Sequence, residues 1–157
     1  ELLEVSLASV NSALQRARTT LAGLDRDSLD TTADPEHQAL LARYVDAFER
    51  YDMEALVSLL HDDAVISMPP YDLWLQGADQ VVGWMVGPGS GCKGSKLIPV
   101  DANGTAGFAS YKPAGTDVWE PWALQVVEVR DGLICGHHNF IYPELFAAFG
   151  LPASLRA

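Results

Sequence analysis

Cysteines, basic residues and long hydrophobic runs are scarce in this sequence, and each shortage excludes a class of protein. The two cysteines, Cys92 and Cys135, lie far apart and show no CxxC spacing, which argues against a disulfide framework and against a zinc site. No apolar run approaches the roughly 20 residues of a membrane span, and the first residues do not resemble a signal peptide. We therefore expect a soluble, cytoplasmic protein with no membrane partner.

Basic residues are outnumbered, with 10 Lys and Arg against 21 Asp and Glu, so that the formal net charge is −11. This charge argues against broad adhesion to nucleic acid or to an anionic membrane. The charge is uneven, however. Residues 1–22 carry two acids and two bases, whereas residues 33–157 carry 16 acids and 7 bases, or −9. Any contact with nucleic acid would therefore belong to the first 22 residues.

The hydropathy pattern divides the chain into three parts. Residues 1–22 contain an amphipathic helix that begins at about Leu7, with apolar residues at helical spacing. Residues 23–33 are rich in Asp and Thr, show no periodicity and are typical of a linker. Residues 34–157 begin with Asp34 and Pro35, a helix cap and a first-turn proline, and form the main domain. The apolar residues of this first helix recur at helical spacing: Leu40, Leu41, Tyr44, Val45 and Phe48.

The main domain shows helical patterns first and extended patterns later. Its second helix follows Asp52 and is expected to end at His61–Asp63. The remaining elements are expected at 64–68 (strand), 77–86 (helix), 96–100, 105–112 and 118–142 (strands), and 143–149 (a helical turn). This order predicts an α+β fold in which helices pack on one face of a curved antiparallel sheet.

Residues 118–142 form one long hairpin around Asp131-Gly132, a strong turn signal. A two-residue turn would pair Arg130 with Leu133. Uninterrupted alternation from this turn would place six residues on one face: Trp122, Leu124, Val126, His137, Asn139 and Ile141. Both faces are largely apolar, so each should be covered by other elements.

Motifs for metal, phosphate or nucleophile chemistry are weak. The loop Gly87–Lys96 has the wrong order and context for a phosphate-binding loop and is expected to be a flexible connector. His137 and His138 are neighbours in a strand, so they point to opposite faces and do not chelate one metal together. No Gly-x-Ser-x-Gly or Cys–His arrangement is present. We expect neither a metal nor a cofactor.

The tryptophans leave two alternatives open. Trp74, Trp84, Trp119 and Trp122 could line a pocket for an apolar ligand, or they could belong to the core. The core is favoured, because buried aromatic residues are usually structural.

The run S-L-A-S-V-N-S-A-L-Q-R-A-R-T-T-L, residues 6–21, resembles the recognition helix of region 4 in the extracytoplasmic-function sigma-70 factors, where a helix-turn-helix binds the −35 promoter element. The resemblance implies that polar side chains of this helix face DNA. These are Ser9, Asn11, Ser12, Gln15, Arg16 and Arg18. The alternative is an ordinary amphipathic helix, and composition does not separate the two.

The main domain is similar to the SnoaL-like branch of the NTF2-like superfamily, a cone of helices around a curved sheet. Three stretches carry the resemblance: H-D-D-A-V-I-S-M-P-P (61–70), R-D-G-L-I (130–134) and Y-P-E-L-F-A-A-F-G-L-P (142–152). It implies a pocket inside the cone. The expected lining residues are Met68, Trp74, Trp84, Trp122, His137 and Asn139.

Some members of this superfamily are enzymes, among them limonene epoxide hydrolase and ketosteroid isomerase. In the hydrolase, the last strand carries a catalytic carboxylate, and Asn139 stands in the matching stretch here. An amide does not act as a general base at neutral pH. We therefore expect no enzyme. The alternative is a small cavity enzyme acting on an apolar substrate, with His137 as its acid or base.

Together the two resemblances predict the C-terminal part of an alternative sigma factor, whose NTF2-like domain regulates promoter-specific transcription initiation. The implied partners are core RNA polymerase, promoter DNA bound through residues 1–22, sigma region 2 of the same protein, and a small apolar ligand in the cone. A dimerisation domain is a third hypothesis.

Overall fold

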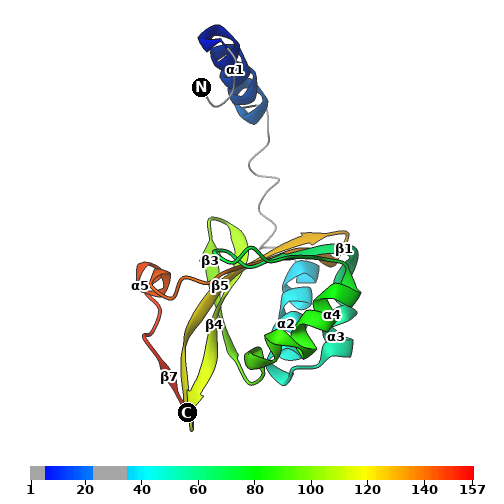
Figure 1. Cartoon of the computed structure of the whole chain (residues 1–157), viewed down its shortest axis with the longest axis vertical. Coiled ribbons are helices and arrows are strands. Elements are labelled where there is room, and N and C mark those ends of the chain that lie inside the picture. Colours follow the sequence, from blue (N-terminus) through cyan, green and yellow to red (C-terminus); the bar gives the residue numbers. More distant parts are fainter. Residues whose placement is uncertain (1–5, 23–34) are drawn as a thin grey trace. The chain divides into compact units, whose positions relative to one another are not determined.

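The computed structural model describes residues 6–22 and 35–157. The chain divides into two compact units, Glu1–Asp30 and Thr31–Ala157, which are considered separately. The first contains helix α1 (Leu7–Ala22), and the second contains the sheet and the other helices (Figure 1). The predicted linker at 23–33 and the predicted cap Asp34 lie outside the described residues.

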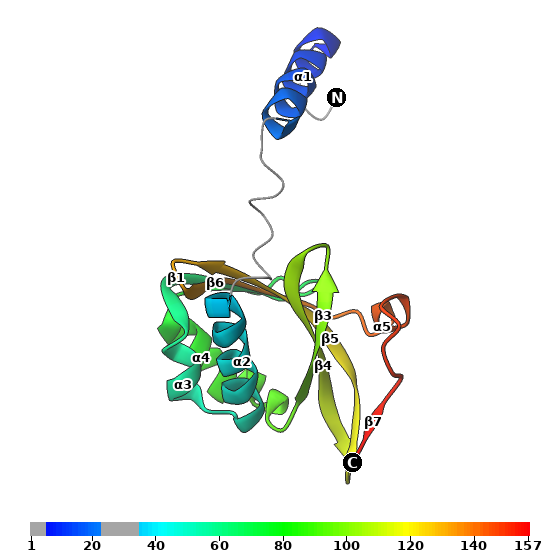
Figure 2. The same ribbon diagram turned by 180° about the vertical axis from the view of Figure 1, so that it is seen from behind.

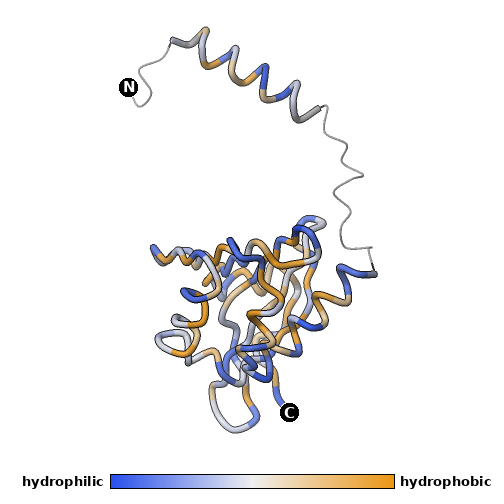
Figure 3. Tube along the Cα trace, turned by 90° about the vertical axis from the view of Figure 1, so that its right-hand side faces the viewer, coloured by the Kyte–Doolittle hydropathy of each residue, from blue (hydrophilic) through white to orange (hydrophobic). Residues whose placement is uncertain are grey.

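Helix α1 confirms the predicted amphipathic helix. The Oγ of Ser6 accepts a hydrogen bond from the backbone N–H of Ser9 at 3.2 Å, as an N-cap residue does. Polar and apolar residues alternate along the helix (Figure 3). Leu14 is 48% exposed, and all six side chains predicted to face DNA are exposed.

The main unit is built on one curved sheet with the strand order β2-β1-β6-β5-β4-β3, and β7 pairs with β5. The strands are β1 (Leu60–Ser67), β2 (Trp74–Gln76), β3 (Lys96–Ala102), β4 (Thr105–Gly115), β5 (Val118–Arg130), β6 (Leu133–Phe140) and β7 (Leu155–Arg156). The α+β prediction is confirmed, but the sheet is mixed, because β1 runs parallel to β6. Strands β2 to β5 lie between β1 and β6 in the sequence, and β6 then pairs with β1.

Helices cover both faces of the sheet (Figures 1 and 2). They are α2 (Pro35–Arg50), α3 (Met53–Val57), α4 (Ala78–Val86), the 3-10 helix η3 (Pro88–Cys92) and α5 (Leu145–Ala148). Helices α2, α3 and α4 pack on one face and α5 on the other. The space between the first three and the sheet is called the cone below. The loop predicted as a flexible connector contains the ordered turn η3, in which Cys92 is buried.

The prediction for the second helix was wrong at its end. Helix α3 begins after Asp52, whose side chain accepts from the N–H of Ala55 at 3.0 Å, but it stops at Val57. The carbonyl of Leu59 accepts from the N–H of Ile134 at 2.8 Å, so the chain has already entered the sheet. His61–Asp63 therefore belong to β1 rather than to a helix end, because pairing with a distant strand outweighs local helix preference.

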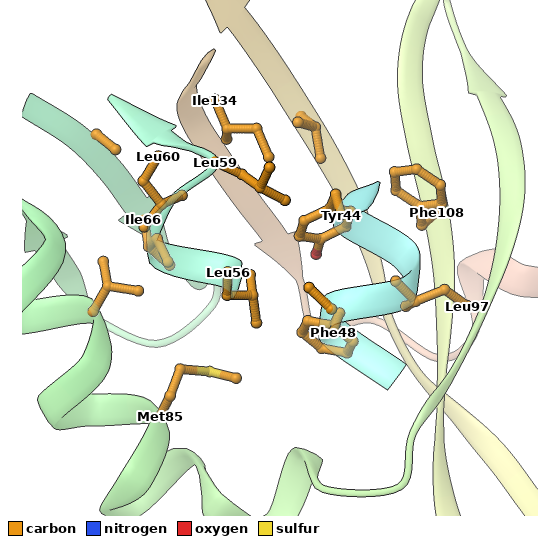
Figure 4. Close-up of a cluster of buried hydrophobic side chains, with 14 of the residues drawn as sticks. Tyr44, Phe48, Leu56, Leu59, Leu60, Ile66, Met85, Leu97, Phe108 and Ile134 are labelled. Carbon is orange, nitrogen blue, oxygen red and sulfur yellow. The ribbon is translucent and has the colours of Figure 1, made fainter. Parts of the chain in front are cut away.

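The main core lies inside the cone. The apolar face of α2 carries Tyr44 and Phe48, which pack between Phe108 of β4 and the side chains of α3 and α4 (Figure 4). A smaller cluster lies on the opposite face, where Tyr111 meets Phe146 of α5 with ring centroids 5.0 Å apart. The expectation that both faces of the hairpin are covered is confirmed.

The predicted turn of the long hairpin is confirmed. Asp131 and Gly132 have φ values of 53° and 73°, and Arg130 pairs with Leu133. Positive φ at both central residues is the conformation that matches the twist of the flanking strands, and a glycine adopts it without strain.

The predicted register fails a few residues from this turn. Val129 pairs with Ile134, but the next pair is Glu128 with Gly136, which leaves Cys135 unpaired on β6. Such a bulge inserts one extra residue into one strand. Beyond it the register is shifted by one, so residues of the two strands that were expected to share a face of the sheet lie on opposite faces.

The bulge corrects the predicted face. His137 lies opposite Val127 and Asn139 lies opposite Gln125, and these four side chains are buried. The predicted grouping with Leu124 is wrong, because Leu124 packs in the smaller cluster on the far side of the sheet.

A second bulge returns Trp122 to the cone. Ser110 pairs with Ala123 and Tyr111 with Pro121, so Trp122 is the extra residue on β5. Its side chain lines a cavity together with His137. The predicted proximity is therefore present, although two bulges produce it rather than simple alternation.

Candidate ligand site in the cone

Two small cavities lie inside the cone, and each has a volume of about 20 Å³. This is room for about one water molecule. Four side chains border both cavities: Phe48, Ile66, Met85 and His137. The first cavity is otherwise apolar. The second is more polar, because Ser110, Gln125 and Asn139 also line it.

Five of the six residues predicted for the pocket line the second cavity: Met68, Trp84, Trp122, His137 and Asn139. The sixth, Trp74, does not, and its side chain is 66% exposed. Trp74 pairs with Ser67, whose Oγ lies 2.8 Å from Nδ1 of His138 on the outer face of the sheet. Trp74 therefore shares that outer face and is removed from the candidate site.

Sequence reasoning missed Tyr44 and Gln125. The hydroxyl of Tyr44 on α2 donates to Oε1 of Gln125 on β5 at 2.8 Å, and its oxygen lies 3.0 Å from Nε2 of His137 on β6. With the hydroxyl proton given to Gln125, we assign the Nε2–H form to His137, which then donates to Tyr44. Helical spacing on α2 identified Tyr44 as core, but no sequence signal paired it with two polar strand residues.

This buried network is electrically neutral. Burial, with a smaller contribution from neighbouring His138, lowers the pKa of His137 to about 4. Burial also raises the pKa of Tyr44 well above its usual value. At neutral pH the imidazole is therefore uncharged and weakly basic, and the site can hydrogen-bond a ligand better than it can accept a proton.

The other two histidines of the sequence motifs, His61 and His138, lie outside the cone. His137 and His138 point to opposite faces of β6, as predicted. His61 lies 2.6 Å from Asp63, which also pairs with Arg130, on an exposed part of β1. Within residues 6–22 and 35–157, no three His, Cys, Asp or Glu side chains are placed to hold one metal ion. None of the helices described is long and apolar enough to span a membrane.

We expect replacement of Tyr44 by Phe to lower the free energy of unfolding by about 1–2 kcal/mol, because two buried polar partners would lose their hydrogen bonds. Urea denaturation measures this change. Tyr71→Phe is the matched control, since Tyr71 is 59% exposed and should change stability little. Adding Gln125→Leu to Tyr44→Phe should recover part of the loss. A double variant as unstable as the sum of both single variants would contradict the network.

The fold and the neutral polar site define a cone-shaped α+β domain of the NTF2-like class. A family model described as SnoaL-like domain matches residues 41–137, and the chain belongs to this family. Several solved structures share the fold. The crystal structure of the extracytoplasmic function sigma factor SigJ of Mycobacterium tuberculosis has a TM-score of 0.57 at 24% identity, covering 96% of this chain and 54% of that one.

A second structure is an LEH-like epoxide hydrolase of M. tuberculosis, with a TM-score of 0.52 at 17% identity, covering 73% of this chain and 89% of that one. Among curated proteins, the ECF RNA polymerase sigma factor SigG of M. tuberculosis is 40% identical over 159 residues. That alignment covers 96% of this chain and 42% of SigG. The chain therefore spans less than half the length of this relative.

Proposed function

We propose that this chain is the C-terminal part of an alternative sigma factor, in which the SnoaL-like domain regulates promoter-specific transcription initiation. One observation carries the proposal. The similarity to SigG, 40% identity over 96% of the chain, extends beyond the SnoaL-like domain at 41–137 to the preceding region that holds α1. An enzyme of the cavity type would not be expected to share the region of α1 as well as the SnoaL-like domain with a sigma factor.

In this proposal, α1 is the end of the promoter-reading helix-turn-helix. The polar side chains assigned to DNA are exposed. They include Arg16 and Arg18, and α1 contains no acidic residue. A helix in the major groove contacts both phosphates and base edges with such side chains. The acidic main domain, at −9 over residues 33–157, is unsuited to DNA contact.

In this proposal the SnoaL-like domain acts on the sigma modules of the same protein, including region 2. It thereby changes the affinity of these modules for core RNA polymerase and for the −35 element. Regulation requires unequal binding of the domain to two states of the sigma factor. A small ligand in the cone would shift that balance. The setting is the cytoplasm, where RNA polymerase acts.

The test is transcription by purified core RNA polymerase with the natural polypeptide that carries this sequence. Deletion of residues 34–157 should change the amount of transcript from its promoter by about fivefold or more, the range of typical coupling between sites. The promoter is first identified by sequencing the transcripts that the holoenzyme makes.

The matched control separates the two parts of the chain. Arg16→Ala with Arg18→Ala should weaken promoter binding but leave binding to core polymerase unchanged, since phosphate contacts supply affinity for DNA. Equal transcript levels with and without residues 34–157 would contradict the regulatory proposal.

The enzyme alternative receives less support. His137 has a pKa of about 4 and is hydrogen-bonded to Tyr44, and the matching position for a catalytic acid holds Asn139. We propose a domain without catalytic activity.

A further inference from the structure

Lys112 of β4 lies at the rim of the second cavity. Its Nζ is 3.5 Å from the centroid of the Trp122 ring, and a methyl group on Gly91 would lie 3.7 Å from the same atom. Trp122 and Cys92, the neighbour of Gly91, both line that cavity. The ammonium group is therefore next to two walls of the cavity.

The charge of Lys112 is directed at the aromatic ring rather than at a carboxylate. By register, Lys112 lies opposite Glu120 of β5, and opposite charges in such positions commonly pair. Yet no acidic group of the described residues lies within ion-pair distance of Lys112, whereas Lys96 pairs with Glu49 at 3.1 Å. A cation over an aromatic face keeps its capacity to bind an anion.

The cavity behind this cation is neutral. Its polar lining consists of a hydroxyl, two amides and the uncharged His137, and the rest is apolar. The site therefore has three parts in order: a cation at the rim, the indole rings of Trp84 and Trp122, and neutral hydrogen-bonding groups inside.

We propose that the cone binds an amphipathic anion, with its apolar body between Trp84 and Trp122 and its anionic head on Lys112. This inference rests on the proposed ligand role of the cone and adds the chemical class of the ligand. A neutral interior excludes a buried charge, because a desolvated charge without a partner is costly. Lys112 supplies the partner at the rim.

Two side chains can make room for such a ligand. Met85 borders both cavities, and its unbranched chain has several rotamers that adapt to new shapes. Trp122 lies at a bulge, outside the regular pairing of β4 with β5. Movement of Met85 joins the two cavities, and movement of Trp122 widens the space beside Lys112 for the head group.

The test uses two fluorescent probes with the same apolar body, 8-anilino-1-naphthalenesulfonate and the uncharged N-phenyl-1-naphthylamine, titrated into the whole chain. Lys112→Met should weaken binding of the sulfonate by about fivefold and leave the neutral probe within about twofold. Lys112→Arg, which keeps the charge, should retain the sulfonate affinity. Lys93→Met, at an exposed lysine that directly follows η3, should change neither.

The outcomes separate this inference from the proposed function. If both probes bind and Lys112→Met affects them equally, the head-group subsite is overturned while a ligand role of the cone stands. If neither probe binds, even to a Met85→Ala variant with joined cavities, the ligand role itself is contradicted. The fold of each variant is checked by thermal unfolding, and a midpoint temperature equal to that of the wild type shows that the fold is intact.

Discussion

Replacement of Phe48 by Ala should lower the free energy of unfolding by about 3–5 kcal/mol, a large part of the stability of a typical domain. Phe48 is 3% exposed, and the centroid of its ring lies 5.8 Å from that of Tyr44 on the preceding turn of α2. It also borders both small cavities. Its removal would join them and leave a void that the surrounding helices and strands fill only in part. Urea denaturation of the whole chain measures the loss.

Val86→Ala is the control for the Phe48 variant. Val86 ends α4 and is 59% exposed, so the loss of its two methyl groups should change stability by no more than about 0.5 kcal/mol. A Phe48→Ala variant that loses less than about 1 kcal/mol would show that the cone is not packed as described.

Acidification should destabilise the domain through His137. Its pKa is about 4 in the folded chain and 6.5 in the unfolded chain. Between these values the unfolded state binds the proton and the folded state does not, so stability is full above pH 6.5 and is lost as the pH falls toward 4. The contribution of this one group is about 3 kcal/mol. Urea denaturation at several pH values measures it.

The His137→Gln variant isolates this contribution from that of the carboxylates, which titrate in part of the same range. Gln keeps a hydrogen-bond donor for Tyr44 but does not titrate. The difference in stability between wild type and variant should therefore shrink by about 3 kcal/mol from pH 7 to pH 4. A difference that is constant with pH would contradict the burial of a neutral imidazole at this position.

These two results bear on the proposed regulation. A ligand shifts the balance between two states only by its unequal affinity for them. The cone described here is nearly filled, so a bound ligand must stabilise a different arrangement of Met85 and Trp122. Phe48 and His137 border the same two cavities. Variants of either should therefore alter probe binding as well as stability.

Much of this protein follows from local sequence. The apolar residues Leu40, Leu41, Tyr44, Val45 and Phe48 recur at helical spacing and predict an amphipathic helix, because side chains three or four residues apart share one side of a helix. Leu40, Tyr44 and Phe48 are buried in α2, while the other two are only partly buried. Asp131 and Gly132 predict the hairpin turn because their backbone angles are intrinsic to these residue types. The motifs of the main domain also predicted the SnoaL-like family that its match confirms.

The parts that failed depend on distant strands. The bulges at Cys135 and Trp122 decide which side chains enter the cone, and the exposed position of Trp74 depends on the pairing of β2 with β1. No local preference encodes these choices, because the energy that selects a register comes from burying the whole face of a strand. The sequence by itself determined most of the longer helices and strands, the hairpin turn and the family, whereas the end of α3, the turn η3 and the short strands β2 and β7 emerged only in the structure. Only the tertiary structure brought Tyr44, Gln125 and His137 together and placed Lys112 over Trp122.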